Sequence, residues 1–488
     1  MRREEDVSTE QIGGFEVEHL CGPEEISYKE NELIVVCLVR DGEPWVKAFV
    51  EHYIHLGARH LVFLDNNSGD GTVSAASEYD NVTVLRVGLP FDADIDGTLG
   101  QMVMRKYLIE RFGKGRWSLC VDIDELFDYP YSDVIGLESL LGYLDSKSYT
   151  AVVAQMLDMF PERPLLEHAD GSDEPLKEVH RFYDISGIER RSRKEHSRRL
   201  STDNLTLESD EIEWYSGGLR RTIFDLPGPW LTKYPLVYYD GILEPVPPHG
   251  VRNARIADLS CVLFHYKFLK NFHEQAVKAV REEQYYSKSR AYKRYLDTLE
   301  HNPELRLRLE SSKEISNVNE LLENRFLVAS EDYVDWVDAE EERSFSKADL
   351  QAETGVSVEA FLRSRRQERA MTLRVGKLEH QLLVRKRQQR MKTRRIRNLR
   401  RKLGDRVQEI KELEKQVFDR EQRITVLERK LRDRRRSLQS LKWRTHRLTR
   451  QKTSLKQQIE NIEASRAWRL ISIILKIKAR LQNLRKRS

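Results

Sequence analysis

Short apolar runs alternate with stretches of helical spacing along residues 32–121, and this alternation limits the possible folds more than any other feature. The predicted strands cover 32–39, 60–64, 82–87 and 117–121, and the predicted helices between them cover 45–56, a short stretch from Thr72, and 98–112. Strands separated by helices form a mostly parallel sheet with helices on both faces, because a parallel neighbour is reached by a right-handed crossover. We therefore expect a Rossmann-like α/β domain whose ligands bind beyond the carboxyl ends of its strands.

Charge divides the chain into two parts of opposite sign. Residues 361–488 hold 42 of the 83 Lys and Arg but only 12 of the 79 Asp and Glu, so their net charge is +30 and that of residues 1–360 is −26. The acidic part contains the aromatic residues that a globular core needs, whereas the basic part lacks proline and is rich in Arg and Leu, as extended helices are. A chain of 488 residues also exceeds what one core usually organises.

These shifts in composition predict five segments. They are an N-terminal extension at 1–29, a globular α/β domain at 30–290 with a polar insertion loop at 171–210, a helical and acidic connector at 291–360, a basic coiled coil at 361–463, and a basic amphipathic helix at 464–488.

The cysteines and the N-terminal residues indicate the cellular compartment in which the protein is expected. Cys21, Cys37, Cys120 and Cys261 are far apart and form no paired metal-ligand spacing, so reduced thiols are expected. The first residues lack the apolar core of a secretory signal, and no run approaches the roughly 18 apolar residues of a membrane span. We expect a cytoplasmic protein, with peripheral contact to the inner face of the membrane as a further expectation for its C-terminal helix.

Acidic residues follow three of the predicted strands, beginning with Asp41, Asp65 and Asp122. Their number at one rim of the sheet favours a bound cation that offsets their mutual repulsion. Asp122 and Asp124 are two residues apart at a strand end, so their side chains are expected to face the same side. Such a pair suits Mn²⁺ or Mg²⁺, which would bridge a diphosphate and stabilise the charge that develops as it leaves.

The first part resembles a known family in several blocks. These are IVVCLVRDGEPWVKAFVEHYIHLGARHLVFLDNNSGDGT from residue 34, GQMVMRKYLIERFG from residue 100, WSLCVDIDELF from residue 117, GGLRRTIF at 217–224, KYPLVYY at 233–239 and VLFHYKF at 262–268. Over roughly residues 30–290 the sequence resembles the glycosyltransferase family 2 group, especially its bacterial branch related to the family 92 domain.

The resemblance implies a GT-A fold, a nucleotide-sugar donor and a metal held by a D-x-D motif, here Asp122 and Asp124. Asp65 matches the acid near the donor's base or ribose, and Asp41 is expected to line the same nucleotide pocket. A late histidine completes the metal shell in many GT-A enzymes, a role open to His249 or, as the alternative, His265. We expect a glycan or lipid-linked acceptor.

Other donor contacts and the catalytic base are less defined by the sequence. Arg220 and Arg221 have the fork geometry that binds phosphate oxygens, with one of the two expected to form only a surface ion pair. Inverting transfer needs a carboxylate beside the acceptor hydroxyl. No E-D block of the usual family kind follows GGLRR, and Asp225 and Glu244 are only nearby acids, so inverting and retaining transfer both stay open.

The basic part shows the period of a coiled coil. Between residues 399 and 462, steps of four and three mark 19 positions, of which 14 are Leu, Ile or Val. We expect this segment to form a homodimer or to pack on a partner helix. In the segment 464–488, Trp468 and neighbouring apolar residues lie beside Lys and Arg, which suits an anionic membrane surface, although these residues could also extend the coiled coil.

Two other classes of protein compete with a glycosyltransferase. The +30 tail could bind a nucleic acid backbone in a non-enzymatic scaffold, although it has few aromatic side chains for base stacking. A nucleotidyltransferase could use the same sheet edge and metal, but no glycine-rich phosphate loop with a basic finger follows the first strand.

Overall fold

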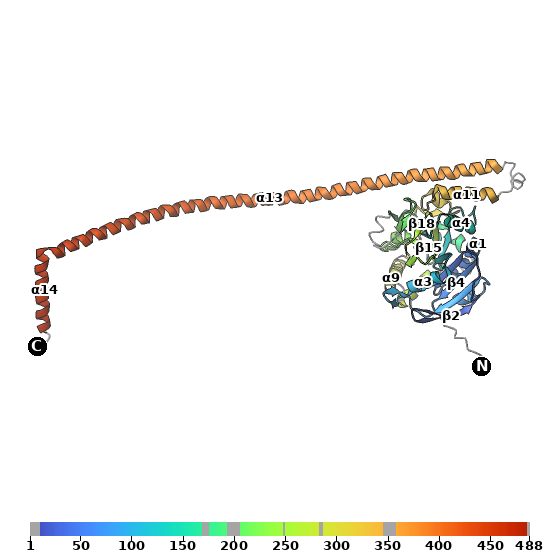
Figure 1. The fold of residues 1–488 in the computed structure, drawn as a ribbon, viewed down its shortest axis with the longest axis horizontal. Coiled ribbons are helices and arrows are strands. Elements are labelled where there is room, and N and C mark those ends of the chain that lie inside the picture. The colour runs from blue at the N-terminus through green and yellow to red at the C-terminus, as the bar shows by residue number, and fades with distance from the viewer. Residues whose placement is uncertain are drawn as a thin grey trace, which may run out of the picture. The chain divides into compact units, whose positions relative to one another are not determined.

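The computed structural model describes residues 10–167, 175–192, 205–246, 249–282, 286–344 and 358–485. The chain forms two compact units, Met1–Leu383 and Val384–Ser488 (Figure 1). The first contains the predicted α/β fold, and the second consists of helix.

A sheet of 11 strands organises the first unit. Its strands, in order across the sheet, are β1 (Gln11–Ile12), β2 (Phe15–Cys21), β5 (Val82–Val87), β4 (His60–Asp65), β3 (Ile34–Val39), β8 (Trp117–Val121), β15 (Thr232–Tyr238), β10 (Ala151–Asp158), β18 (Arg255–His265) and β13 (Thr206–Leu207), with β9 (Glu125–Asp128) paired to β18. The predicted alternation of strands and helices is confirmed, and eight of the eleven strands run in the same direction.

Three strands, β2, β9 and β15, run against this common direction, and the last two matter for the site. β15 is antiparallel to both β8 and β10, and β9 is antiparallel to β18. The carboxyl ends of β3, β4, β8, β10 and β18 therefore meet the amino ends of β9 and β15 at one edge of the sheet.

Helices cover both faces of this sheet, as the pattern predicts. Val35 and Cys37 of β3 pack in the core that includes α1 (Glu43–Leu56) and α4 (Leu137–Ser146). Ile34 and Val36 point to the other face, where α3 (Gly100–Phe112) packs. Because successive strand residues face opposite sides, a fully apolar strand such as β3 requires cover on both.

The remaining elements of the first unit are short. The helices are α2 (Thr72–Ala76), α5 (Leu176–Val179), α7 (Leu219–Phe224), α8 (Phe272–Glu282), α9 (Tyr286–His301), α10 (Glu320–Glu323) and α11 (Glu331–Ser344). The strands are β6 (Asp94–Ile95), β7 (Thr98–Leu99), β11 (Phe182–Tyr183), β12 (Ile188–Arg191), β14 (Trp214–Gly217), β16 (Glu244–Val246), β17 (Gly250–Arg252) and β19 (Lys313–Glu314). The insertion expected at 171–210 falls partly outside the described residues, and its described parts contain α5, β11, β12 and β13.

The segment expected to be a connector, 291–360, contributes to the core of the first unit. Its buried apolar side chains include Leu321, Phe326, Tyr333 and Val337. Helix α13 (Val358–Ala464) begins in this unit, where Arg369 is buried and forms ion pairs with Asp338 and Glu341 of α11.

The second unit contains the rest of α13 and helix α14 (Arg466–Arg485), in agreement with the predicted helical tail. The two helices are separated at Ser465, whose hydroxyl accepts a hydrogen bond from the Trp468 amide, as an N-cap residue does. The apolar side chains that mark the coiled-coil period are exposed in the single chain. Within the described part of the chain, no helix has both the length and the apolar content needed to cross a membrane.

Candidate active site

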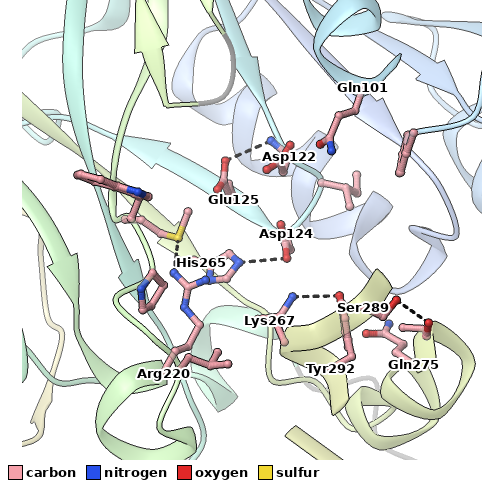
Figure 2. Close-up of a pocket in the computed structure, with 18 of the residues that line it drawn as sticks. Gln101, Asp122, Asp124, Glu125, Arg220, His265, Lys267, Gln275, Ser289 and Tyr292 are labelled. Carbon is pink, nitrogen blue, oxygen red and sulfur yellow. Dashed lines mark hydrogen bonds and ion pairs between the residues drawn. The ribbon is translucent and has the colours of Figure 1, made fainter. Parts of the chain in front are cut away.

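The edge at which the strand ends meet borders a cavity of about 760 Å³. Figure 2 shows carboxylates and a histidine from the sheet on one side of it, with Lys267, Gln275, Ser289 and Tyr292 across from them. The cavity is therefore built from segments that are far apart in the sequence but adjacent at this edge.

The first aspartate of the D-x-D motif is held by two cations. β8 ends at Val121, so Asp122 lies past the strand, and the Glu125 amide donates to the Asp122 carbonyl oxygen at 3.0 Å in a turn. Asp122 and Asp124 thus lie in a turn rather than in regular strand alternation, and both border the cavity. One oxygen of Asp122 accepts from Arg105 at 2.6 Å and the other accepts from Lys233 at 2.7 Å.

Lys233 is the buried cation at the centre of this group. It stands near the start of β15, is 5% exposed, and also pairs with Glu125 at 2.6 Å. Burial alone would raise the pKa of Asp122, but the charges of Arg105 and Lys233 outweigh it and lower that pKa. Burial by itself would lower the pKa of Lys233, but the charges of Asp122 and Glu125 outweigh burial and raise this pKa above its usual value. The lysine therefore stays charged.

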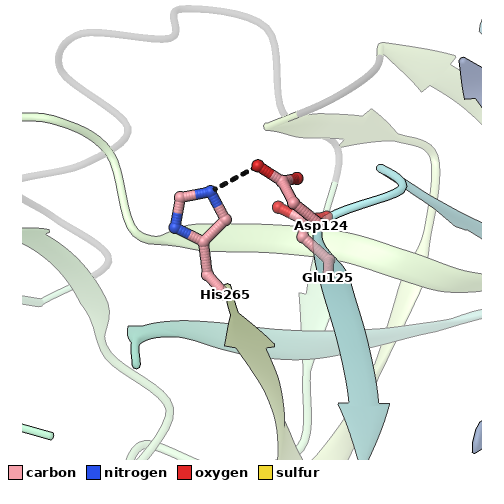
Figure 3. A group of neighbouring side chains, drawn as sticks. All are labelled: Asp124, Glu125 and His265. Carbon is pink, nitrogen blue, oxygen red and sulfur yellow. Dashed lines mark ion pairs between the residues drawn. The ribbon is translucent and has the colours of Figure 1, made fainter. Parts of the chain in front are cut away.

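Asp124, Glu125 and His265 form a group that could hold a divalent metal ion. One ligand atom from each lies within 4.8 Å of the others, and the three come from the turn after β8, the start of β9 and the end of β18 (Figure 3). His265 Nε2 lies 3.2 Å from an oxygen of Asp124. Two carboxylates and an imidazole suit Mn²⁺ better than Mg²⁺, which favours oxygen ligands alone.

A second carboxylate lies behind His265. Asp158 ends β10 and accepts a hydrogen bond from His265 Nδ1 at 2.6 Å, while its other oxygen accepts from Arg220 Nε at 3.0 Å. This hydrogen bond fixes the ring orientation and leaves Nε2 directed to Asp124, which is the arrangement that metal-binding histidines adopt. Arg220 therefore lines the cavity as part of a fixed network rather than as a free side chain.

Cations from several other segments also border the cavity. Lys267, which precedes α8, contacts the Tyr292 hydroxyl at 3.2 Å, and Lys278 of α8 donates to Asp41 at 2.6 Å. Arg40 also lines the cavity, and its Nε is buried without a hydrogen-bond partner among the described residues. The cavity thus combines a group that could hold a metal ion with nearby cations, a combination suited to a diphosphate.

The structure separates the two acids expected in the nucleotide pocket. Asp41 lines the cavity, where burial raises its pKa but the hydrogen bonds from Lys278 and Gly69 outweigh burial and lower it. Asp65 is fully buried, pairs with Arg86 at 3.0 Å and accepts from the Ser68 amide, and it does not border the cavity. Its position supports the loop that meets Asp41.

The two remaining candidates, His249 and Arg221, differ in whether they border the cavity. His249 borders it, with Nδ1 hydrogen-bonded to the Thr232 carbonyl oxygen at 2.9 Å, and burial together with Lys233 lowers its pKa to about 4. Arg221 pairs with Glu189 away from the cavity, as expected for one of the two arginines.

Neither of the two acids expected as candidate bases borders the cavity. Asp225 is 91% exposed at its side chain and pairs with Arg294. Glu244 pairs with Arg252 in the small β16 and β17 hairpin. Their ion pairs give them a structural role that the sequence could not reveal.

Sequence reasoning missed Arg105, Lys233 and Asp158 as parts of the site. Asp158 follows the apolar run of β10, so the rule that singled out Asp122 would also have found it. Lys233 carried no such signal, because it lies at the beginning of a strand and reaches this edge only because β15 runs in the opposite direction.

No protein-family model matches the sequence, and no curated protein matches it. Among solved structures, S. aureus TarS 1-349 is 12% identical, covering 63% of this chain and 82% of its own, with a TM-score of 0.26. The same protein in complex with UDP-GlcNAc is 14% identical, covering 28% of this chain and 38% of its own, with a TM-score of 0.21. A nucleotidyl transferase from Methanothermobacter thermautotroptrophicus is 12% identical, covering 28% and 64%, with a TM-score of 0.16. This chain covers 38% of TarS 1-349 in complex with UDP-GlcNAc and 26% of a further S. aureus TarS structure, so it spans less than half of the length of each.

Proposed function

We propose that this chain is a glycosyltransferase that moves a sugar from a nucleotide-diphosphate donor to a glycan or other envelope acceptor. The observation that carries the proposal is the group of Asp124, Glu125 and His265 at the carboxyl edge of a Rossmann-like sheet, facing cations across one cavity. The blocks that resemble glycosyltransferase family 2 lie in the elements that form this edge.

Each side chain has a distinct part in this proposal. Asp124, Glu125 and His265 would hold a divalent ion, which when bound offsets the charge that develops on the leaving diphosphate. Lys267 and Arg40 bind the donor's phosphate oxygens from the other side of the cavity. Asp41 lies next to the nucleoside end and hydrogen-bonds the ribose or base.

Asp122 is assigned a positioning role rather than that of the main metal ligand. Both of its oxygens accept hydrogen bonds from buried cations, so a metal bound there would separate Arg105 from its carboxylate and leave Lys233 with Glu125 alone. Held in this way, Asp122 fixes the turn that presents Asp124 and Glu125 to the cavity.

Binding of the donor should raise the melting temperature only when a divalent ion is present. A ligand that binds the folded state at 100 times its Kd adds about 2.7 kcal/mol, which raises the Tm of a unit of this size by about 3 °C. Thermal shifts with UDP, GDP, UDP-GlcNAc and the free nucleosides, each with Mn²⁺ and with EDTA, test this expectation. Equal shifts for nucleosides and diphosphates, or no dependence on Mn²⁺, would contradict the assigned site.

Removal of residues 466–488 should release the protein from anionic vesicles. Trp468, Ile471 and Ile474 are exposed on α14 beside basic residues, and an amphipathic basic helix binds the interface through both apolar area and charge. We expect the intact chain to sediment with phosphatidylglycerol vesicles, and to remain in solution with neutral phosphatidylcholine vesicles. Equal binding of the intact and shortened chains would show that α14 is not the contact.

A further inference from the structure

A continuous apolar seam lies exposed along the part of α13 that belongs to the second unit. Its positions follow steps of three and four from Leu403 to Ile462, and the apolar ones are at least half exposed in the single chain. A seam of this period is covered by another helix in stable coiled coils. α14 begins only after the break at Ser465, so the seam ends where the helix does.

Four seam positions carry a cation instead of an apolar side chain, namely Arg406, Arg420, Arg434 and Lys452. In a parallel dimer in register, every seam residue meets its own copy across the interface. Each of these cations would then be buried against an identical cation, and like charges in a desolvated seam strongly oppose association. A parallel pairing of two copies is therefore disfavoured.

An antiparallel pairing removes all four of these conflicts. With Leu403 of one copy opposite Ile462 of the second, the whole seam overlaps. In this register Arg406 faces Ile459, Arg420 faces Thr445, Arg434 faces Leu431, and Lys452 faces Leu413. Each cation then lies beside an apolar or hydroxyl-bearing side chain, along which its aliphatic stem packs while the charged end reaches water.

The residues that flank the seam favour the same register. Glu428 of one copy lies next to Arg435 of the second, and Glu421 lies next to Lys442. By symmetry each pair occurs twice. The same register also sets Arg423 against Arg444, which is one like-charge pair against the two attractive ones. The parallel arrangement instead brings Lys430 to Arg435 and Glu409 to Glu414, two like-charge pairs, against the single attractive pair of Arg423 and Glu428.

We propose that two copies of this chain associate through residues 403–462 as an antiparallel two-stranded coiled coil. The paired region extends roughly 90 Å at 1.5 Å per residue. The matched acids and bases argue for a second copy rather than a nucleic acid, because a phosphate backbone would meet Glu421 and Glu428 as like charges. Each copy's α14 lies outside the paired region.

Cross-linking of full-length single-cysteine variants distinguishes the two orientations. Leu427 and Leu438 face one another only in the antiparallel register, so L427C and L438C co-expressed with tags of different size should give a mixed covalent dimer under mild oxidation. Either variant alone should stay uncrosslinked, like the unaltered chain with its four native cysteines. Covalent dimers of L427C alone would indicate a parallel pairing and overturn the proposal.

Charge reversal provides an independent test by sedimentation equilibrium. R435E should raise the dimer Kd by about tenfold, because it turns two attractive pairs into repulsive ones, and R435E with E428K should recover the original value. In a parallel dimer R435E would instead tighten association by relieving Lys430. R429E, on the outer face of the helix, is the matched control and should leave the Kd unchanged. A chain that stays monomeric at micromolar concentration, with or without DNA bound, would also overturn the proposal.

Discussion

Asp124→Asn should reduce sugar transfer by at least about 100-fold and remove the effect of Mn²⁺ on nucleotide-diphosphate binding. The side chain supplies a carboxylate oxygen to the only group of His, Cys, Asp and Glu ligand atoms that the described residues bring within 4.8 Å of one another. An amide keeps the shape but loses the negative charge that binds a cation. Titration of Mn²⁺ by electron paramagnetic resonance, together with a donor turnover assay, measures both effects.

Asp225→Asn is the matched control for this substitution. Asp225 is 91% exposed and pairs with Arg294 outside the cavity, so its loss should leave Mn²⁺ binding and turnover within about twofold. Asp122→Asn separates the two members of the D-x-D motif, since Asp122 already pairs with Arg105 and Lys233. If Asp124→Asn bound Mn²⁺ as the unaltered chain does, while Asp122→Asn did not, the metal would belong to Asp122 instead.

The fold was predictable because its signals are local. The apolar runs that become β3, β4, β5 and β8 each lie within six residues, and the helices between them show their own spacing. Strands of a sheet that is covered on both faces keep such runs largely apolar.

The site was predictable only where it depended on that local pattern. Asp41, Asp122 and Asp124 were found because they follow strands, and the structure places all three at one cavity. Asp65 follows a strand as well, but Arg86 on the neighbouring β5 neutralises it, and this pairing depends on sheet register. A rule about strand ends gives the edge on which a side chain lies, whereas its partner across the sheet decides whether it is free to bind a ligand.

The second half of the site depends on strand direction, which the sequence did not specify. β15 lies between β8 and β10 but runs against both, and this direction brings Lys233 beside Asp122 and Glu125. The segment KYPLVYY gives no role for its lysine when it is read as sequence alone. Long-range pairing of this kind has no local signature, so a buried cation at the centre of the acids went unnoticed.

Lys233→Met should destabilise the first unit by about 3–5 kcal/mol, because it leaves the buried carboxylate of Glu125 without its counter-charge and Asp122 with only one. The methionine fills a similar volume, so the loss reflects charge rather than packing. Urea unfolding at neutral pH measures the difference in free energy.

Adding Glu125→Gln should recover part of the loss, because a neutral amide needs no counter-charge. The deficit should also shrink as the pH is lowered, since the unpaired carboxylates of the variant have raised pKa values and become neutral. Lys106→Met, at an exposed lysine paired with Glu110, should change the free energy of unfolding by less than about 0.5 kcal/mol. A Lys233→Met variant as stable as Lys106→Met would mean that Lys233 does not hold the carboxylates in place, and that the turn presenting Asp124 and Glu125 is fixed by other contacts.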